Sequence, residues 1–461
     1  MKIVHIITRL ILGGAQENTL ITCKLQAERG HEVTLITGPA LGPEGQLFDL
    51  TKDQKYRTIV VDEMRRAILP FKDYASYTKV KALLRELQPD IVHTHSAKAG
   101  IIGRFAAWSL KGQWQSRGEA VPALRVAGVP PALRGQDALV TQGPDARESG
   151  MGFQPMSHRQ DADAIKLRGR DAHATQGQDA LATVLRPVVV HSIHGLSFHP
   201  YQNPWANRLY IAIEKAAAKR TDYFISVADA MTEQCRAEGI GLDKPYVTAY
   251  SAIEEEPFLT PIPPDKLLAF RRQHNIPSDA VVLVTIARLF MLKGHEYIIE
   301  SARELSRRLP HAFWLFVGNG NLADEYREQV CHLGLTDRFR FTGLVPPDQV
   351  PLTIQASDIL VHCSLREGLA RTLPQAMLCG RPAISFDVDG AREVVNETTG
   401  RLIEPKDVHQ LVEACAELIA DKSLRERLGA AGRESVRTKF APDTMVDTIE
   451  SVYRALLDGR R

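Results

Sequence analysis

The 461-residue sequence has little that would place it in a membrane, on a nucleic acid or in an oxidising compartment. Its longest apolar runs fall far short of the roughly 20 residues that a spanning helix needs, and its start shows no signal-peptide pattern. The formal net charge of +2 argues against a nucleic-acid partner. Its six cysteines show no paired spacing, which is typical of a reducing compartment. We therefore expect a cytoplasmic protein.

What the sequence does contain suits a globular protein of two or more domains. It is 44% hydrophobic and 24% charged, enough to build real cores. Short apolar runs alternate with helical segments, a pattern that predicts an α/β fold with parallel sheets. The expected strands are 2–7, two runs that begin at 91 and 188, and then 281–287, 312–317, 338–341, 358–362 and 382–386.

Two cations follow one of these strands. The β-branched run 281–287 is typical of a strand buried on both faces, and Arg288 comes at its carboxyl end, where open α/β sheets bind ligands. Arg288 offers a planar bidentate fork and Lys293 a compact charge. The two can neutralise a pair of phosphates without a metal ion, although an ordinary surface ion pair is the alternative.

A second motif lies some 70 residues downstream. Gly368, Leu369 and Ala370 lead into a helix start, with Thr372 as the expected cap and Gln375 three residues later. Backbone amides at such a start attract anions, and Glu367 just before it places a carboxylate where a sugar would lie. Cations and amides together indicate a diphosphate.

At this point the chain resembles the retaining GT-B glycosyltransferases of family 4, the glycosyl transferases group 1. The family signature is Glu, seven residues, Glu, with an Arg and a Lys upstream. Here the first position is Glu367 and the second is Gln375. The resemblance implies that the first lies against the donor sugar and that the second holds the ribose hydroxyls. A neutral acceptor bonds about half as strongly as an ionised one, and Gln375 could instead only complete a capping box with Thr372.

Two glycine turns agree with the resemblance. Gly13 and Gly14 follow the first strand and open a helix, like the family's Gly-Gly loop that faces the donor diphosphate. A plain turn is the alternative. Gly318 closes the strand 312–317, and we expect it to be a further donor-facing turn. It does not belong to a dinucleotide fingerprint, because the third glycine is missing.

Histidines end the strands that begin at 91 and 188, which should bring His95 and His194 to one rim. The second run resembles the family's His-Gly element, and this resemblance gives His194 a place at the reacting sugar. We assign His95 to the acceptor side. His93 and His95 share one strand face, and His191 with His194 also mimics ligand spacing, but no cysteine or carboxylate cluster accompanies them. We expect no metal.

Asp387 and Asp389 also look like a metal-binding Asp-x-Asp pair. They follow the strand 382–386, where the family carries a turn before a helix. We therefore interpret them as turn and helix-cap residues.

The segment 111–186 differs from the rest of the chain. The stretch 133–146 recurs at 167–180, an offset of 34, and the composition has few large apolar residues. Solenoid repeats would carry an apolar face to stack, and this one offers little. We predict a low-complexity insertion that is mostly disordered, with a partner-binding role left open.

The resemblance implies two Rossmann-like domains that face each other across a cleft. The acceptor-side domain would span 1–110 with 187–257, the nucleotide-sugar domain 258–440, and a terminal helix at 441–461 would cross back to the first domain. Arg65 and Arg66 flank an apolar loop in the first domain. This loop could touch a lipid-linked acceptor or the inner face of the membrane, but more often such a stretch is merely solvated.

The expected activity is retaining, metal-independent transfer of a sugar from a nucleotide-diphosphate sugar to a hydroxyl acceptor. A UDP-sugar is the expected donor, and no cofactor is needed. The acceptor could be a glycan, a lipid-linked sugar or a small molecule. Two alternatives remain at this stage: a catalytically impaired sugar-nucleotide or partner-binding protein, and a sugar-nucleotide epimerase.

Overall fold

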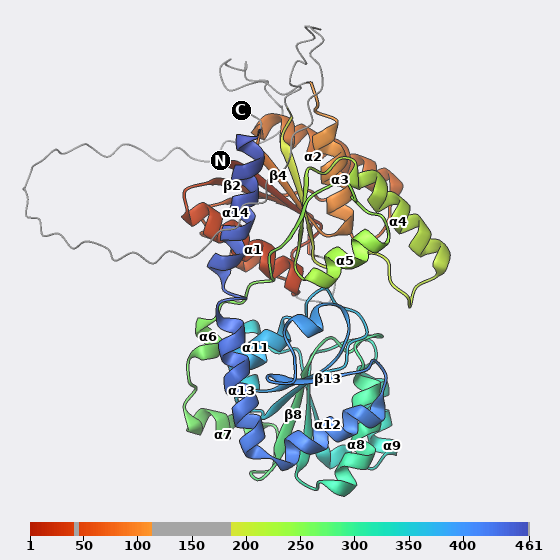
Figure 1. The fold of residues 1–461 in the computed structure, drawn as a ribbon, viewed down its shortest axis with the longest axis vertical. Helices are drawn as coiled ribbons and strands as arrows, with labels where there is room; N and C mark the ends of the chain where they lie inside the picture. Colours follow the sequence, from red (N-terminus) through yellow and green to blue (C-terminus); the bar gives the residue numbers. More distant parts are fainter. Residues whose placement is uncertain (41–45, 113–185, 460–461) are drawn as a thin grey trace, which may run out of the picture. The chain divides into compact units, whose positions relative to one another are not determined.

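The computed structural model describes residues 1–40, 46–112 and 186–459, and these contain two parallel sheets (Figure 1). The predicted insertion, with its internal repeat, lies outside the described residues except at its ends. The two sheets and their helices belong to one compact unit of the chain.

The first sheet has seven parallel strands in the order β3-β2-β1-β4-β5-β6-β7. Its strands are β1 (Lys2–Ile7), β2 (Glu32–Thr37), β3 (Arg57–Val60), β4 (Ile91–His95), β5 (Val188–Ile193), β6 (Tyr223–Ser226) and β7 (Tyr246–Thr248). The order reverses between β1 and β4, and open α/β sheets bind ligands outside the strand ends at such a reversal.

The second sheet has six strands in the order β10-β9-β8-β11-β12-β13. They are β8 (Val281–Ile286), β9 (Ala312–Val317), β10 (Phe339–Gly343), β11 (Ile359–His362), β12 (Ala383–Phe386) and β13 (Gly400–Ile403). The reversal here lies between β8 and β11. The strands predicted from the sequence are confirmed to within one or two residues, because strands buried on both faces leave continuous apolar runs.

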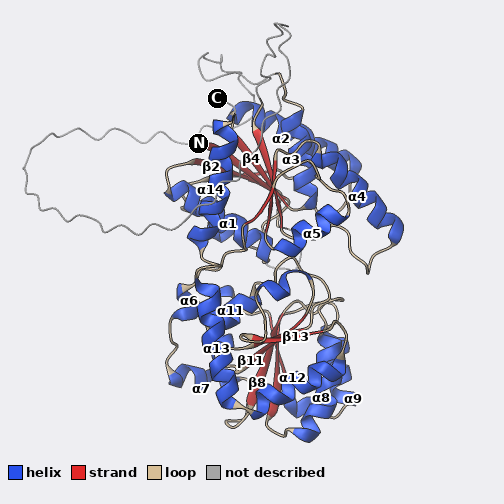
Figure 2. Cartoon of the chain, in the orientation of Figure 1, coloured by secondary structure: helices blue, strands red, loops and turns tan. Residues whose placement is uncertain are grey.

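Helices cover both faces of each sheet (Figure 2). Those with the first sheet are α1 (Gly14–Glu28), α2 (Pro70–Leu87), α3 (Ala97–Trp108), α4 (Pro204–Ala218) and α5 (Asp229–Ala237). Those with the second are α7 (Pro264–Gln273), α8 (His295–Arg308), α9 (Ala323–His332), α10 (Val350–Gln355), α11 (Thr372–Leu378), α12 (Val408–Ala420) and α13 (Lys422–Arg437), with α6 (Glu256–Leu259) preceding them. Short 3-10 turns complete the fold: η1 (Phe48–Thr51), η2 (Thr336–Arg338), η3 (Pro347–Gln349) and η4 (Asp389–Glu393).

The last helix, α14 (Pro442–Asp458), packs against the first sheet and not the second. Its buried side chains Met445, Ile449 and Tyr453 join the same core cluster as Ile3 of β1 and Leu20 of α1. An apolar stripe at helical spacing buries itself on the nearest complementary face. The terminal helix therefore returns to the domain in which the chain begins.

None of the helices in the described ranges combines the length and apolar character needed to cross a bilayer.

Candidate active site

One cavity of about 370 Å³ lies at the ends of the strands next to the two reversals. Every residue that the sequence analysis predicts for catalysis or donor binding lines it: Gly13, Gly14, His194, Arg288, Lys293, Gly318, Glu367, Gly368, Leu369, Ala370 and Gln375. Its volume is that of a typical small-molecule site. The structure thus brings these residues together, while their individual roles remain predictions.

Lys293 and Glu367 form an ion pair in this cavity. Lys293 Nζ lies 2.5 Å from Glu367 Oε1, and His362 Nε2 lies 3.5 Å from the same oxygen. Burial alone would raise the pKa of the Glu367 carboxyl, but Lys293 and His362 outweigh it and hold that pKa well below its usual range. The carboxylate is therefore ionised at any physiological pH.

The backbone around Glu367 is held by contacts that the sequence does not reveal. Asp389 Oδ2 accepts a hydrogen bond from the Glu367 amide at 2.6 Å, and its Oδ1 accepts one from Gln234 Nε2 at 2.8 Å. Gly368 packs so closely on His194 that a Cβ there would lie 2.1 Å from the His194 carbonyl oxygen. Only glycine fits at this position.

The Asp387–Asp389 pair has the turn role that we predict, but not the capping role. Asp387 Oδ2 accepts a hydrogen bond from Arg392 at 2.7 Å. Asp389 begins η4, and its carboxylate points to the Glu367 amide and to Gln234. Burial raises its pKa. Asp389 is thus a positioning residue for Glu367.

Arg371 is a third cation in the cavity, and it is not among the predicted site residues. Its Nη2 lies 3.0 Å from Glu17 Oε2 of α1, and its side chain is only 11% exposed. A Cβ on Gly14 would lie 2.9 Å from Arg371 Cδ. Among the described residues, Arg371 Nε and Nη1 have no hydrogen-bond partner. Two buried donors beside the glycine pair are therefore available to an anionic ligand.

The predicted cap of α11 is wrong. The helix begins at Thr372, Arg371 takes the cap position, and no side chain accepts a capping hydrogen bond. The Thr372 hydroxyl is buried without a partner among the described residues. Gln375 therefore completes no capping box, and it lines the cavity instead.

The three residues assigned to the acceptor side lie outside this cavity. His95 is 1% exposed and sits one hydrogen bond behind His194, so it has no free surface with which to touch an acceptor. Arg65 Nε donates to the Asp62 carbonyl oxygen at 2.7 Å, and Arg66 is exposed beside it. An acceptor contact stays a prediction for these two arginines.

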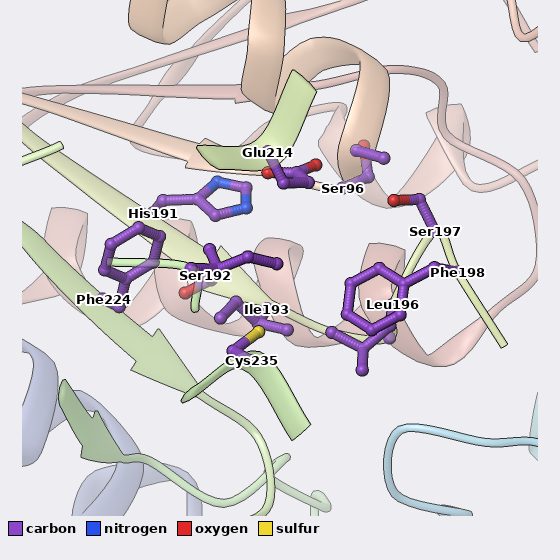
Figure 3. Close-up of a pocket in the computed structure, with 13 residues that line it drawn as sticks. Ser96, His191, Ser192, Ile193, Leu196, Ser197, Phe198, Glu214, Phe224 and Cys235 are labelled. Atoms are coloured by element: carbon purple, nitrogen blue, oxygen red, sulfur yellow. The ribbon is translucent and has the colours of Figure 1, made fainter. Parts of the chain in front are cut away.

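A smaller cavity lies beside the end of β5 (Figure 3). His191 and Glu214 face it, and Glu214 Oε2 lies 2.7 Å from Nη2 of the fully buried Arg104. Its volume of about 20 Å³ is enough for one water molecule and far too small for a sugar. The large cavity is therefore the better candidate for substrate.

Three histidines of the described residues lie close enough to hold a metal ion. Ring nitrogens of His5, His93 and His95 lie within 4.8 Å of one another, and all three side chains are buried. Each ring nitrogen already has a hydrogen-bond partner. A metal ion would have to displace those bonds.

The fold has two parallel sheets, each with a reversal in strand order, and its cavity is lined by cations, a glycine pair and an ionised carboxylate. Together these features define a GT-B type of nucleotide-sugar enzyme. The Glycosyl transferases group 1 model matches residues 268–435, and the Glycosyl transferase 4-like domain model matches 13–149. The chain therefore contains a group 1 glycosyltransferase domain, and it is a glycosyltransferase. It is an enzyme that uses nucleotide sugars.

Curated relatives agree with this assignment. The UDP-Gal:alpha-D-GlcNAc-diphosphoundecaprenol alpha-1,3-galactosyltransferase of Escherichia coli is 25% identical over 98% of this chain and 96% of its own length. The 2-deoxystreptamine N-acetyl-D-glucosaminyltransferase of Streptomyces fradiae is 28% identical over 53% of this chain and 58% of its own. Both are glycosyltransferases by name, although they act on different acceptors.

Solved structures share the fold. Anabaena HepE in complex with UDP aligns with a TM-score of 0.69 at 16% identity, covering 99% of this chain and 100% of its own. WaaG, a glycosyltransferase involved in lipopolysaccharide biosynthesis, aligns with a TM-score of 0.63 at 16% identity, covering 97% and 99%. At such identities the likeness establishes the GT-B fold alone.

Proposed function

We propose that this protein transfers a sugar from a UDP-sugar to a hydroxyl group of a lipid-linked acceptor, with retention of anomeric configuration and without a metal ion. The observation that carries the proposal is the single cavity lined by Arg288, Lys293, Glu367 and His194 together with the glycine pair. Cations for a diphosphate and an ionised carboxylate for a sugar meet there.

The donor diphosphate would lie among three cations. Arg288 offers a bidentate fork, Lys293 a point charge and Arg371 its two unpaired donors. Their charge can do the work that a metal ion does in other transferases, because it stabilises the negative charge that grows on the leaving diphosphate. The E. coli relative takes its galactose from UDP-galactose by name, which supports uracil as the base of the donor.

The reaction would proceed on one face of the sugar. The bond between the sugar C1 and the β-phosphate oxygen breaks, and the acceptor hydroxyl oxygen bonds to C1 from the same side. The acceptor proton passes to the departing phosphate oxygen, so no separate base is required. Glu367 and His194 would orient the sugar by hydrogen bonds, which lowers the entropic part of the barrier.

The proposed acceptor domain has exposed apolar side chains at the starts of two helices, and basic residues accompany them. Phe71 is 93% exposed at the start of α2, and Ile68 is 69% exposed just before it. Trp205, at the start of α4, is 75% exposed and lies against the Arg208 guanidinium. Arg65 and Arg66 precede the apolar group. Exposed apolar side chains with cations suit the surface of an anionic membrane, and the E. coli relative acts on an undecaprenol-linked substrate by name.

Replacing Lys293 by Met should weaken UDP binding by about 10- to 100-fold, since a hydrogen bond to a charged group contributes roughly 1.5–3 kcal/mol. The affinity for UMP, which lacks the second phosphate, should fall much less. Titration calorimetry with both nucleotides measures the difference. Lys422→Met is the matched control, because that side chain is 79% exposed and outside the cavity. Equal losses of affinity for UDP and UMP would show that Lys293 does not bind the second phosphate.

Gln375→Glu restores the carboxylate of the family signature and should lower the donor KM about tenfold, because an ionised acceptor bonds ribose hydroxyls more strongly. The gain should vanish with a 2′,3′-dideoxy UDP-sugar, which has no such hydroxyls. Steady-state kinetics with both donors tests the prediction. If the donor KM also falls with the dideoxy donor, residue 375 does not contact the ribose hydroxyls.

The proposed function is tested by incubating the protein with a panel of UDP-sugars and an undecaprenyl-diphosphate sugar in detergent, with and without EDTA. The expected product is an α-linked disaccharide lipid from an α-linked donor, formed at the same rate in EDTA. A β-linked product would contradict retention, and loss of activity in EDTA would contradict metal independence. Conversion of a UDP-sugar into its epimer without any acceptor would identify an epimerase.

The membrane contact has its own test. The protein should sediment with vesicles of phosphatidylglycerol and much less with phosphatidylcholine, and Phe71→Ser should reduce the bound fraction. Leu242→Ser is a matched control, since Leu242 is 70% exposed but is not part of this apolar group. Equal loss in both variants would exclude the surface around Phe71.

A further inference from the structure

A row of buried side chains connects the interior of the first sheet to the cavity. Gln26 Oε1 lies 2.8 Å from His5 Nε2, His5 Nδ1 lies 2.9 Å from His95 Nε2, and His95 Nδ1 lies 3.0 Å from His194 Nε2. His5, His95 and His194 come from the neighbouring strands β1 and β4 and from the end of β5. Only His194 of these lines the cavity.

The acceptor at the inner end gives this row one direction. The Gln26 carbonyl oxygen can only accept a hydrogen bond, so the proton of a neutral His5 lies on Nε2. His5 Nδ1 must then accept from His95 Nε2–H, and His95 Nδ1 must accept from His194 Nε2–H. Each imidazole therefore has one proton, and its position is determined by the next residue inward.

The charges around the row favour neutral rings. Burial lowers the pKa of His5 and of His194 to about 4, and it lowers that of His95 well below its ordinary value. His93 and His191 act in the same direction on His95, and Arg371 does so on His194. Gln26 raises the pKa of His5 through its hydrogen bond, but burial outweighs it. Among the described residues, no carboxylate contributes to the pKa shift of any of these three rings.

We propose that Gln26, His5 and His95 are positioning residues that hold His194 in one orientation and in its Nε2–H tautomer. This leaves Nδ1 as the nitrogen that His194 offers to the cavity, where it acts as a hydrogen-bond acceptor. The inference deepens the proposed function, because the group that it would bind is a hydroxyl of the donor sugar. A ring that can only accept favours a hydroxyl over an ether or a carbonyl at that point of the sugar.

His93 belongs to a separate branch and provides an internal control. Its Nδ1 lies 2.5 Å from the Tyr453 hydroxyl and its Nε2 lies 2.7 Å from Ser192 Oγ. It is as buried as His95 and lies on the same strand, yet both of its ring nitrogens bond outside the row. If substitutions acted only by disturbing the sheet, replacing His93 or His95 should have similar effects on His194. A change in the His194 tautomer should instead result only from replacing His95.

The first test measures the unaltered protein without an acceptor, and a variant is needed only to assign the His194 signal. Nitrogen-15 NMR of the histidine rings in the ligand-free protein should show His194, identified by its loss in His194→Gln, as a neutral ring with its proton on Nε2 at about pH 7.5. An Nδ1–H tautomer, or a protonated ring, would overturn the proposal. Because no sugar is transferred in this measurement, its failure is distinct from failure of the proposed function.

Three variants then test the row. His95→Leu removes the acceptor, so the His194 signals should show mixed tautomers, and kcat should fall about tenfold or more with little change in donor KM. His95→Gln keeps one acceptor and one donor and should restore both the tautomer and most of kcat. His93→Leu should leave the His194 signals unchanged. A pure Nε2–H tautomer in His95→Leu would overturn the proposal.

Metal analysis of the purified protein decides between the row and a metal centre. The row predicts less than about one-tenth of a zinc, cobalt or nickel ion per chain after dialysis against the metal, because every ring nitrogen of His5, His93 and His95 is engaged. One ion per chain, lost in His5→Leu, would show that these histidines are ligands and would overturn the proposed tautomers.

Discussion

Glu367→Gln should lower the transfer rate about a thousandfold or more and leave UDP affinity within a few-fold of the unaltered protein. The substitution keeps the shape of the side chain and removes its charge. Glu367 is ionised in the cavity beside Lys293, and loss of one preorganised charged contact in an active site costs about 10²- to 10³-fold. The amide would also leave Lys293 without its partner carboxylate, which adds to the loss.

Single-turnover kinetics with a radiolabelled UDP-sugar separates these effects from donor binding. Glu296→Gln is a matched control in the same domain, since Glu296 accepts a hydrogen bond from the Tyr326 hydroxyl at 3.1 Å but does not line the cavity. It should retain most of its activity. Glu367→Ala should be at least as inactive as Glu367→Gln. Normal turnover by either Glu367 variant would show that Glu367 has no role in the reaction.

The donor side of the site could be predicted from sequence because its residues lie at strand ends. Arg288 follows β8 closely, and the Gly13–Gly14 pair follows β1 and opens α1. Apolar runs locate the strands, and parallel topology then gathers their carboxyl ends. Gln375 and Glu367 belong to one local motif, so their common cavity also follows from local sequence.

The remaining contacts could not be predicted because they join residues that are distant along the chain. Asp389 holds the Glu367 amide across 22 positions, and Arg371 meets Glu17 of another helix. No local pattern distinguishes these residues from ordinary surface charges. The predicted acceptor-side role of His95 is wrong for the same reason. The sequence places it at the rim of the sheet, but only the packing of β1 and β4 shows that His5 and His194 enclose it.

The helix cap shows how a local rule is overridden by packing. Thr372 followed by Gln375 predicts a capping box, yet the chain reaches α11 through Arg371 in a helical conformation. The side chain of Arg371 forms an ion pair with Glu17 of another helix, a contact that the local sequence does not reveal. Gln375 lines the cavity, at the position of the family's second carboxylate.

The free energy of unfolding should fall steeply as the pH is lowered from about 6.5 toward 4. Burial lowers the pKa of His5 and His194 to about 4 and that of His295 to about 3, from an ordinary value of 6.5. In this pH window the unfolded chain binds protons that the folded chain does not, so stability is lost as the pH falls. Above about pH 6.5 neither state is protonated at these rings, and the effect disappears.

The expected slope is about 1.4 kcal/mol per pH unit for each such histidine. His93, His95 and His191 add to it, because burial lowers their pKa values in the same direction. The His191 ring is buried against Phe224, and Arg104 further opposes its protonation. A single domain is stabilised by only about 5–15 kcal/mol, so a fall of about one to two pH units below 6.5 should remove much of that margin.

Urea denaturation at about pH 8, 6.5 and 5 measures this dependence. The midpoint should be similar at the two higher values and much lower at the third. His95→Gln removes one buried ring and should make the dependence shallower. His311→Asn is the matched control, because it removes a ring whose side chain is 61% exposed. Equal midpoints at all three pH values would mean that the buried rings accept protons in the folded state. The rings of the first sheet would then be open to solvent, and the fixed tautomer of His194 would have no physical basis.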